Sequence, residues 1–208
     1  MKSRRKFLVG FIGAMPISAI AGKLPSRVTP SEIEGPFYPV YPQKDKDFDL
    51  TQVEGRSESA LGNPIFNKGT IRDSNGDPIE DASVDIWQAN AAGRYRHPHD
   101  RNPAPLDPNF QGWAIVQSGR RGQFNFKSVM PGAYPASDSW TRPPHIHFKV
   151  SKTGYVELTT QMYFPNQVLN DADLLLQRKS ESERKLLIAQ LDASRSDTYL
   201  FDIYLRKI

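Results

Sequence analysis

Cysteine is absent from the 208-residue chain. Its absence excludes disulfide frameworks, thiolate zinc sites, iron–sulfur clusters and cysteine nucleophiles, because each of these needs a cysteine sulfur. Histidine is scarce, with four residues in the whole chain. A metal site would therefore have to combine these few imidazoles with ligands of other kinds.

An excess of positive charge is also absent once the N-terminus is set aside. Four of the 27 Lys and Arg residues lie in the first 21 positions, which contain no acidic residue, so 23 basic and 23 acidic side chains remain. The net charge of +4 and the sequence pI of about 9.2 thus come mostly from the N-terminus. The neutral remainder has no general basic field, and we expect no nucleic-acid partner.

No apolar run is long enough for a comfortable membrane span. The stretch MKSRRKFLVGFIGAMPISAIAG has a basic start and an uncharged segment from Phe7 to Ala21, shorter than the roughly 20 residues that a spanning helix needs. The segment ends in a small-x-small cleavage signal, and SRRKFL is similar to a twin-arginine export signal. We predict a signal peptide at residues 1–21, periplasmic export, and no stable membrane anchor after cleavage; a retained N-terminal anchor is the competing interpretation.

The rest of the composition favours an all-β fold. Proline and glycine are spread through the chain, with 17 and 14 residues, which is typical of short strands joined by ordered loops. Residues 22–64 are irregular and proline-rich, and we expect an extended arm laid over the core. Residues 65–208 are predicted to form a β-sandwich of short mixed strands with long ordered loops and one late helix.

Local patterns predict the individual elements. The stretch FNKGTIRDSNGDPIEDASVDIWQAN predicts a hairpin, because Asn75-Gly76 suits a tight turn with positive φ. A capping box at residues 180–183, followed by Leu187 and Leu191 at helical spacing, predicts the helix. We expect a long ordered loop at residues 90–112 and further strands at residues 113–118, 122–127, 146–151, 156–164 and 198–206.

The stretch RPPHIHFKV, residues 142–150, holds two of the four histidines. Its β-branched and aromatic residues predict a strand, and side chains two residues apart share one side of a strand, so His145 and His147 should point the same way. We expect this strand to be buried on both faces. Two buried imidazoles need partners for their nitrogens. A metal ion could be the partner of these nitrogens, and so could ordinary hydrogen-bonding groups.

Further ligands would have to come from other parts of the chain. His97 and His99 form a rival pair in HPHD, where the polar surroundings predict a surface loop. Tyrosine is a second possibility, with Tyr95 in AAGRYRH and Tyr134 in the stiff turn MPGAYPAS. Phenolate is a hard ligand, so two phenolates with two imidazoles would favour ferric iron. Spacing alone does not select these two from the eight tyrosines of the chain.

A series of motifs narrows the choice of metal ligands. DIWQANAAGRYRH, APLDPNFQG, PGAYP, RPPHIHF, TTQMYF and YLFDIYLR follow one another to the C-terminus, and EGPFYP lies in the arm. Together they resemble the intradiol ring-cleaving dioxygenases, and within them the branch that cleaves protocatechuate. The resemblance covers most of the chain after residue 21. The combination of GRYRH, PGxYP and RPxHIHF is specific, whereas each motif alone would be weak.

The resemblance implies a β-sandwich that holds Fe(3+) through four residues, namely Tyr95, Tyr134, His145 and His147. It implies that Tyr134 leaves the iron when substrate binds. Arg142 corresponds to a family arginine, and a fixed positive charge there would stabilise anionic states of the reaction; its alternative is a plain salt bridge. Gln161 corresponds to a polar residue that lines the pocket, or it is a hydrogen-bonding residue of the core.

The implied reaction cleaves a catechol-type aromatic, such as protocatechuate, between its two hydroxylated carbons with O2 and yields a cis,cis-muconate. The implied partners are the catechol, O2, and a second copy or a related chain. Two departures bear on specificity: Ala136 stands where protocatechuate-cleaving members carry tryptophan, and Thr141 separates Trp140 from Arg142. A carboxylated substrate would need a cation, which could come from Arg94, Arg96 or Arg142.

Two other interpretations remain open at this point. The first is a non-catalytic β-sandwich that binds metal or aromatics, which a broken ligand set would indicate, whereas all four expected ligands are present. The second is a zinc enzyme whose ligands are His97, His99, His145 and His147. Such an enzyme would be colourless and would keep its metal after Tyr95 and Tyr134 are replaced by Phe.

Overall fold

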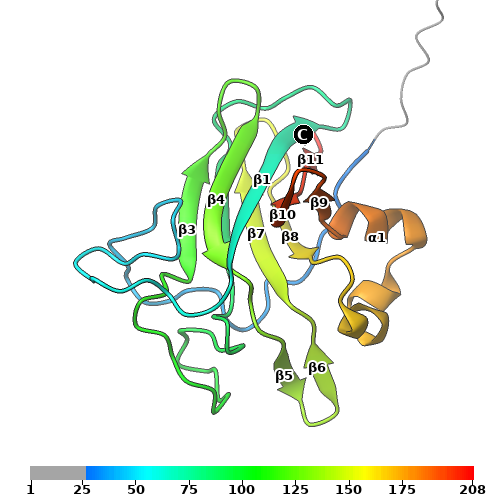
Figure 1. Ribbon diagram of the computed structural model, residues 1–208. Coiled ribbons are helices and arrows are strands. Elements are labelled where there is room, and N and C mark those ends of the chain that lie inside the picture. The colour runs from blue at the N-terminus through cyan, green and yellow to red at the C-terminus, as the bar shows by residue number, and fades with distance from the viewer. Residues whose placement is uncertain (1–26) are drawn as a thin grey trace, which may run out of the picture.

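Residues 27–208 are described by a computed structural model (Figure 1), so the predicted signal peptide at residues 1–21 lies outside the described residues. These residues form strands β1 (Pro64–Asp73), β2 (Ser83–Trp87), β3 (Trp113–Gln117), β4 (Gln123–Val129), β5 (Tyr134–Ser137), β6 (Trp140–Arg142), β7 (His145–Ser151), β8 (Leu158–Tyr163), β9 (Gln190–Asp192), β10 (Arg195–Leu200) and β11 (Ile203–Leu205). The helical elements are two short 3-10 helices, η1 (Val168–Ala172) and η2 (Leu176–Arg178), and the helix α1 (Glu181–Leu187).

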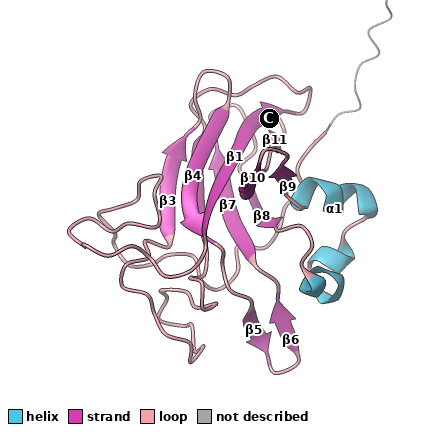
Figure 2. Ribbon diagram, viewed as in Figure 1, coloured by secondary structure: helices cyan, strands magenta, loops and turns pink. Residues whose placement is uncertain are grey.

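Two sheets make up the sandwich. In the first, β1 pairs antiparallel with β4 on one side and parallel with β10 and β11 on the other, and β9 follows β10. The second has the order β3-β2-β7-β8, and all of its pairs are antiparallel. Figure 1 shows the β5–β6 hairpin projecting beyond the sheets, and Figure 2 shows the helices gathered at one side of the strands. The predicted all-β sandwich with mixed strands and one late helix is confirmed.

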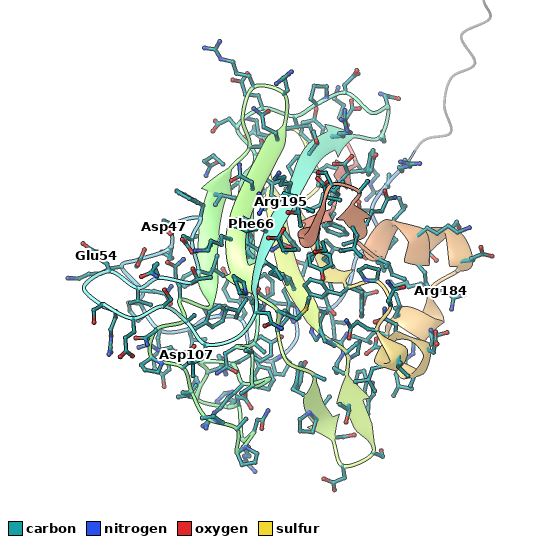
Figure 3. The ribbon with its side chains drawn as sticks, viewed as in Figure 1. Asp47, Glu54, Phe66, Asp107, Arg184 and Arg195 are labelled. Atoms are coloured by element: carbon teal, nitrogen blue, oxygen red, sulfur yellow. The ribbon has the colours of Figure 1, made fainter. Side chains whose placement is uncertain are left out.

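The core lies between the two sheets. Ile146, Phe148 and Val150 alternate along β7 on the face toward the first sheet, and all three are fully buried. Phe148 packs against Phe124 and Phe126 of β4, with ring centroids 6.1 and 6.0 Å apart. On the opposite, outer face of the first sheet, Arg195 lies over the ring of Phe66 with 4.7 Å to the ring centroid (Figure 3).

The predicted hairpin around Asn75-Gly76 is confirmed at its turn, but it does not extend into a pairing of β1 with β2. The chain does turn there, because Gly76 has a φ of 95° and its amide donates to the carbonyl of Asp73. However, β1 and β2 belong to different sheets. Beyond an isolated bridge between Arg72 and Pro78, the chain crosses to the second sheet and buries Ile79 in the core. The bridge is flanked by two backbone hydrogen bonds, from the amide of Asp73 to the carbonyl of Asp77 and from the amide of Ile79 to the carbonyl of Ile71.

Two other predicted elements have different bounds. The strand expected at residues 198–206 is split into β10 and β11, and between them the carbonyl oxygen of Phe201 approaches β1 at Gly69, where an added Cβ would lie 1.9 Å from that oxygen. The capping box at Ser180 and Glu183 is confirmed, but α1 ends at Leu187. Leu191 lies in β9 and is 42% exposed, so its assignment to the helix is wrong.

The arm, residues 27–63, follows the free edge of β8 and then crosses the outer face of the second sheet. The amide of Glu32 donates to the carbonyl of Thr159, and Nε2 of Gln161 donates to the carbonyl of Ile33 at 2.8 Å. Further along, the ring of Phe37 packs against Tyr95, with centroids 4.9 Å apart. Within residues 27–208, no helix is long and apolar enough to cross a membrane.

Candidate metal centre

A row of side chains crosses the outer face of the second sheet. Cross-strand pairing places Trp113 beside Trp87, Trp87 beside His147, and His147 beside Gln161. In the neighbouring row, His145 pairs with Tyr163. His145 and His147 therefore share one face of β7, as their spacing predicts, and the arm covers that face.

Four side chains converge above this row. The Nε2 atoms of His145 and His147 are 3.2 Å apart, and Nε2 of His147 lies 3.2 Å from the phenol oxygen of Tyr95. The ring of Tyr134 is 5.4 Å from that of Tyr95 and 5.6 Å from that of His145. All four side chains are buried. The structure thus brings together the four residues that the sequence nominates as ligands.

Two adjoining turns bring the tyrosines to the histidines. The carbonyl of Asn90 accepts hydrogen bonds from the amides of Gly93 and Gly132, which ties the loop that carries Tyr95 to the turn that carries Tyr134. Gly93 has a φ of +80°, and a Cβ on it would lie 2.3 Å from the carbonyl oxygen before Tyr134. The amide of Tyr95 also donates to Asp100 Oδ2 at 2.7 Å. The predicted long loop is therefore ordered by its own hydrogen bonds.

The Nε2 nitrogen of His145, which faces His147, carries a lone pair. Nδ1 of His145 lies 2.7 Å from the carbonyl oxygen of Pro143, an acceptor, so this nitrogen holds the proton and Nε2 is free to bind a cation. Burial, Arg142 and His147 lower the pKa of His145 well below its usual value. Burial and the charge of Arg142 lower the pKa of His147 to about 3. Both imidazoles are therefore neutral ligands at neutral pH.

The tyrosines would need a strong cation to ionise. Burial, followed by the neighbouring Tyr134, raises the pKa of the Tyr95 phenol well above its usual value. Burial also raises the pKa of Tyr134, although Arg142 opposes the shift. Two neutral imidazoles and two phenols that only a highly charged ion would deprotonate fit a hard trivalent metal such as ferric iron, and fit a soft monovalent one poorly.

Arg142 lies beside these ligands in a buried polar network. Its Nη1 is 3.4 Å from Nε2 of His145, its Nε donates to Asp173 Oδ2 at 2.9 Å, and its Nη2 donates to Tyr163 at 2.8 Å. Arg142 is 3% and Asp173 0% exposed, so this is a fully buried ion pair. Burial alone would lower the pKa of Arg142, but Tyr163 and Asp173 raise it, and the guanidinium stays charged. The salt bridge and the placement next to the ligands, weighed as alternatives from the sequence, occur together.

Gln161 links the network to the arm. Its Oε1 accepts from Arg142 Nη2 at 2.9 Å while its Nε2 donates to Ile33. Its side chain is fully buried. The amide therefore orients Arg142 in this state of the protein, and its contact with a substrate stays a prediction.

Four residues of the site were not nominated from the sequence. Asp173 holds Arg142, Trp87 stacks on His147, and Tyr163 and Phe37 line the space around the ligands. Trp87 and Tyr163 lie inside the motifs DIWQAN and TTQMYF, which is the signal that could have found them. Asp173 lies in a polar segment without periodicity, and no local pattern marks it.

The rival histidine pair takes no part in the centre. His99 is exposed, and its amide donates to Nδ1 of His97 at 3.2 Å. The ring of His97 packs against Phe37 instead, with centroids 5.7 Å apart. In residues 27–208, which include all four histidines, no three His, Asp or Glu side chains gather to hold a metal ion. The structure therefore does not bring the four histidines together, as the all-histidine zinc site would require.

Comparison with known proteins agrees with this geometry. Residues 33–207 match a family model described as "Dioxygenase". The chain is 38% identical over 182 residues to the protocatechuate 3,4-dioxygenase beta chain of Burkholderia cepacia, covering 82% of this chain and 77% of the relative. It is 30% identical over 166 residues to the chlorocatechol 1,2-dioxygenase of Cupriavidus pinatubonensis, covering 71% of this chain but only 59% of that relative. The chain belongs to the intradiol ring-cleaving dioxygenase family.

Solved structures support the same fold. The dioxygenase domain of a fusion with a carbohydrate-binding protein, from Streptomyces sp. SirexAA-E, superposes with a TM-score of 0.66 at 25% identity and covers 88% of this chain and 100% of that one. The 3-chlorocatechol 1,2-dioxygenase of Rhodococcus opacus 1CP superposes with a TM-score of 0.68 at 24% identity, covering 88% of this chain and 74% of that one.

Proposed function

We propose that this protein is an Fe(3+)-dependent dioxygenase that cleaves a catechol-type aromatic between its two hydroxylated carbons. Both atoms of O2 enter the product, a cis,cis-muconate. The observation that carries the proposal is the convergence of two imidazole Nε2 atoms 3.2 Å apart with a phenol oxygen 3.2 Å from one of them, inside a buried space that also holds Tyr134. Membership of the ring-cleaving family supports it.

Tyr95, Tyr134, His145 and His147 would hold the iron. When bound, ferric iron would draw electron density from a catecholate and make its ring reactive toward O2. The protein would supply proton transfer and charge. The phenolate oxygen of Tyr134 would accept a proton from one hydroxyl of the incoming substrate. Arg142, fixed by Asp173 and Tyr163, offers a positive charge next to His145 for the anionic states that follow.

We propose a protocatechuate-like substrate, and the 38% identity to a protocatechuate 3,4-dioxygenase chain supports this class. Arg142 already has a buried counter-ion, which makes it a poor partner for a substrate carboxylate. Arg94 and Arg96 are the remaining candidates, and Nη1 of Arg94 is held by the carbonyl of Ala104. Ala136 is exposed on β5 two residues after Tyr134, and its small side chain is consistent with a wider pocket than a tryptophan would leave.

Two further proposals concern partners and location. The relative at 38% identity is a beta chain, which supports assembly with a second copy or a related chain. The twin-arginine pattern at the N-terminus supports export to the periplasm and a role in aromatic catabolism there. Expression of the full chain with a C-terminal tag, followed by fractionation and mass spectrometry of the mature N-terminus, tests the location. A chain that stays in the cytoplasm with residues 1–21 intact would contradict it.

The first test of the function is the visible spectrum of the purified, iron-loaded protein without oxygen. A broad red-purple tyrosinate-to-iron band that shifts when protocatechuate or catechol is added is the expected result. Admission of O2 should then consume the catechol and yield the ring-opened dicarboxylate, with the substrate that responds most strongly naming the class.

Three variants sharpen this test. Tyr95→Phe and Tyr134→Phe should each weaken or displace the band because each removes one phenolate. Tyr199→Phe is the matched control, since Tyr199 packs against Phe164 in the core and lies outside the metal centre. A colourless protein that retains stoichiometric zinc, with no response to any catechol, would contradict the proposal.

A further inference from the structure

We propose that Trp87 is the positioning residue of His147 and that it fixes the imidazole by stacking. The two rings are nearly parallel, with an interplanar angle of 12° and centroids 4.8 Å apart. Both side chains are at least 97% buried, and their residues are direct cross-strand partners in β2 and β7. Backbone register and ring contact therefore place the same pair together.

The stack replaces a contact that His147 lacks. A histidine that binds a metal usually donates its other ring N–H to a carbonyl, carboxylate or water, which sets its tautomer and ring plane. His145 follows this rule through Nδ1 and the carbonyl of Pro143. Nδ1 of His147 is buried and has no hydrogen-bond partner in the protein. Of the two imidazoles, only His147 lacks a hydrogen bond at Nδ1, so packing must hold that side of its ring.

Packing can fix the orientation of the His147 ring only if Trp87 is itself rigid. Two further aromatic side chains hold Trp87 in place. Tyr38 meets it edge-on, with centroids 5.0 Å apart and an angle of 83°. Trp113 is its partner on the other neighbouring strand. Both of these side chains are anchored to Asp85, since the Tyr38 hydroxyl donates to Oδ2 at 2.6 Å and Nε1 of Trp113 donates to Oδ1 at 2.7 Å. The carboxylate thus stiffens the aromatic group that orients His147.

The inference rests on the proposed function in one respect, because the value of a fixed His147 lies in binding the ferric ion. It predicts that an aromatic ring at position 87 is needed, beyond the volume that it fills. A stacked aromatic pair stabilises a protein by more than its buried area alone would give. Loss of a residue that orients a metal ligand typically lowers the affinity for the metal by about 10- to 100-fold.

The experiment compares Trp87→Phe, which keeps a ring, with Trp87→Leu, which keeps bulk without one. Tyr199→Leu is the control, because it removes an aromatic ring that packs against Phe164, outside the metal centre. Ferric affinity is measured by competition with a chelator. We expect Trp87→Leu to lose about 10-fold or more, and Trp87→Phe and Tyr199→Leu to lose less than about 3-fold. Equal losses in Trp87→Phe and Trp87→Leu, or no loss in Trp87→Leu, would overturn the inference.

A second readout needs neither iron nor a variant. In the metal-free wild-type protein, a ring stacked at 4.8 Å should shift the carbon-bound protons of the His147 imidazole upfield in a proton–carbon NMR spectrum, relative to those of exposed His99. Resonances of His147 at ordinary positions would refute the stack, even if Trp87→Leu fails to fold. Wild-type protein that does not bind ferric iron at all would instead overturn the proposed function, and the ring shift would still decide the role of Trp87.

Discussion

Replacing Asp173 by Asn removes the counter-charge of Arg142 while keeping nearly the same side-chain shape. Both partners are almost completely buried, with Nε and Oδ2 2.9 Å apart. A buried guanidinium cannot shed its proton at accessible pH, so the variant must bury an uncompensated charge or open the site to water. Removing one partner of such a pair typically costs about 3–5 kcal/mol.

The pair also organises the chain around it. Oδ1 of Asp173 accepts the amides of Leu175 and Leu176, which begin η2, so the carboxylate joins this segment to β6. For a protein of this size, about 3–5 kcal/mol corresponds to a fall in Tm of about 6–20 °C. Urea denaturation followed by circular dichroism, with metal content held constant, measures the change in the free energy of unfolding.

A surface pair is the matched control. Asp197 bonds Arg195 at 3.0 Å, but the two side chains are 42% and 51% exposed, so Asp197→Asn should leave stability unchanged. If Asp173→Asn is as stable as Asp197→Asn, Arg142 is not held by a buried charge pair and the reasoning about its fixed charge fails. If Asp173→Asn is strongly destabilised and the double variant Arg142→Met/Asp173→Leu recovers much of the loss, the cost lies in the unpaired charge.

Three further predictions concern the frame of the site. Gly93→Ala should destabilise the protein far more than Gly55→Ala in thermal melts, because both have a φ near +80° but only Gly93 would bring a Cβ within 2.3 Å of a carbonyl oxygen, that of Ala133; equal effects would mean that the close approach is unimportant. Ser180→Ala removes the acceptor of the capping box and should cost about 1 kcal/mol in urea denaturation, and a neutral result would refute the cap. Burial alone would raise the pKa of Asp73, but hydrogen bonds from two nearby backbone amides and the charge of a nearby lysine hold this pKa below its usual value. The ionised carboxylate therefore stabilises the fold above about pH 4, and this stabilisation is lost as the pH falls through the native pKa of Asp73. Asp73→Asn should therefore be less stable at pH 7, and the gap to the wild type should narrow in acid; a gap that stays constant with pH would contradict this.

The ligand set could be predicted from the sequence for two different reasons. Side chains in a strand alternate, so the spacing of His145 and His147 alone fixes their common face. The tyrosines carry no such signal, and only the motifs around Tyr95 and Tyr134 single them out from the other six. The site therefore follows partly from geometry and partly from resemblance.

The rest of the site depends on contacts that no local pattern encodes. Asp173 reaches Arg142 from 31 residues further along the chain. Asp171 lies two residues away in the same segment, and only the tertiary fold decides that Asp173 is the buried one. The predicted continuation of the hairpin into β2 is wrong for a similar reason. A turn at Gly76 reverses the chain but cannot specify that β1 pairs with strands from the far end of the sequence.

That pairing has a consequence for how a newly made chain matures. One side of β1 pairs with β10 and then with β11, whose residues are synthesised long after β1 and after those of every other strand of the two sheets. Until Ile203 has left the ribosome, half of this side has exposed amides and carbonyls, which is the form in which strands adhere to one another. The first sheet can therefore be completed only after all four candidate metal ligands on the earlier part of the chain have been synthesised. A chain truncated just before Ile203 would keep all four candidate ligands but leave this half of β1 unpaired, and we expect it to aggregate.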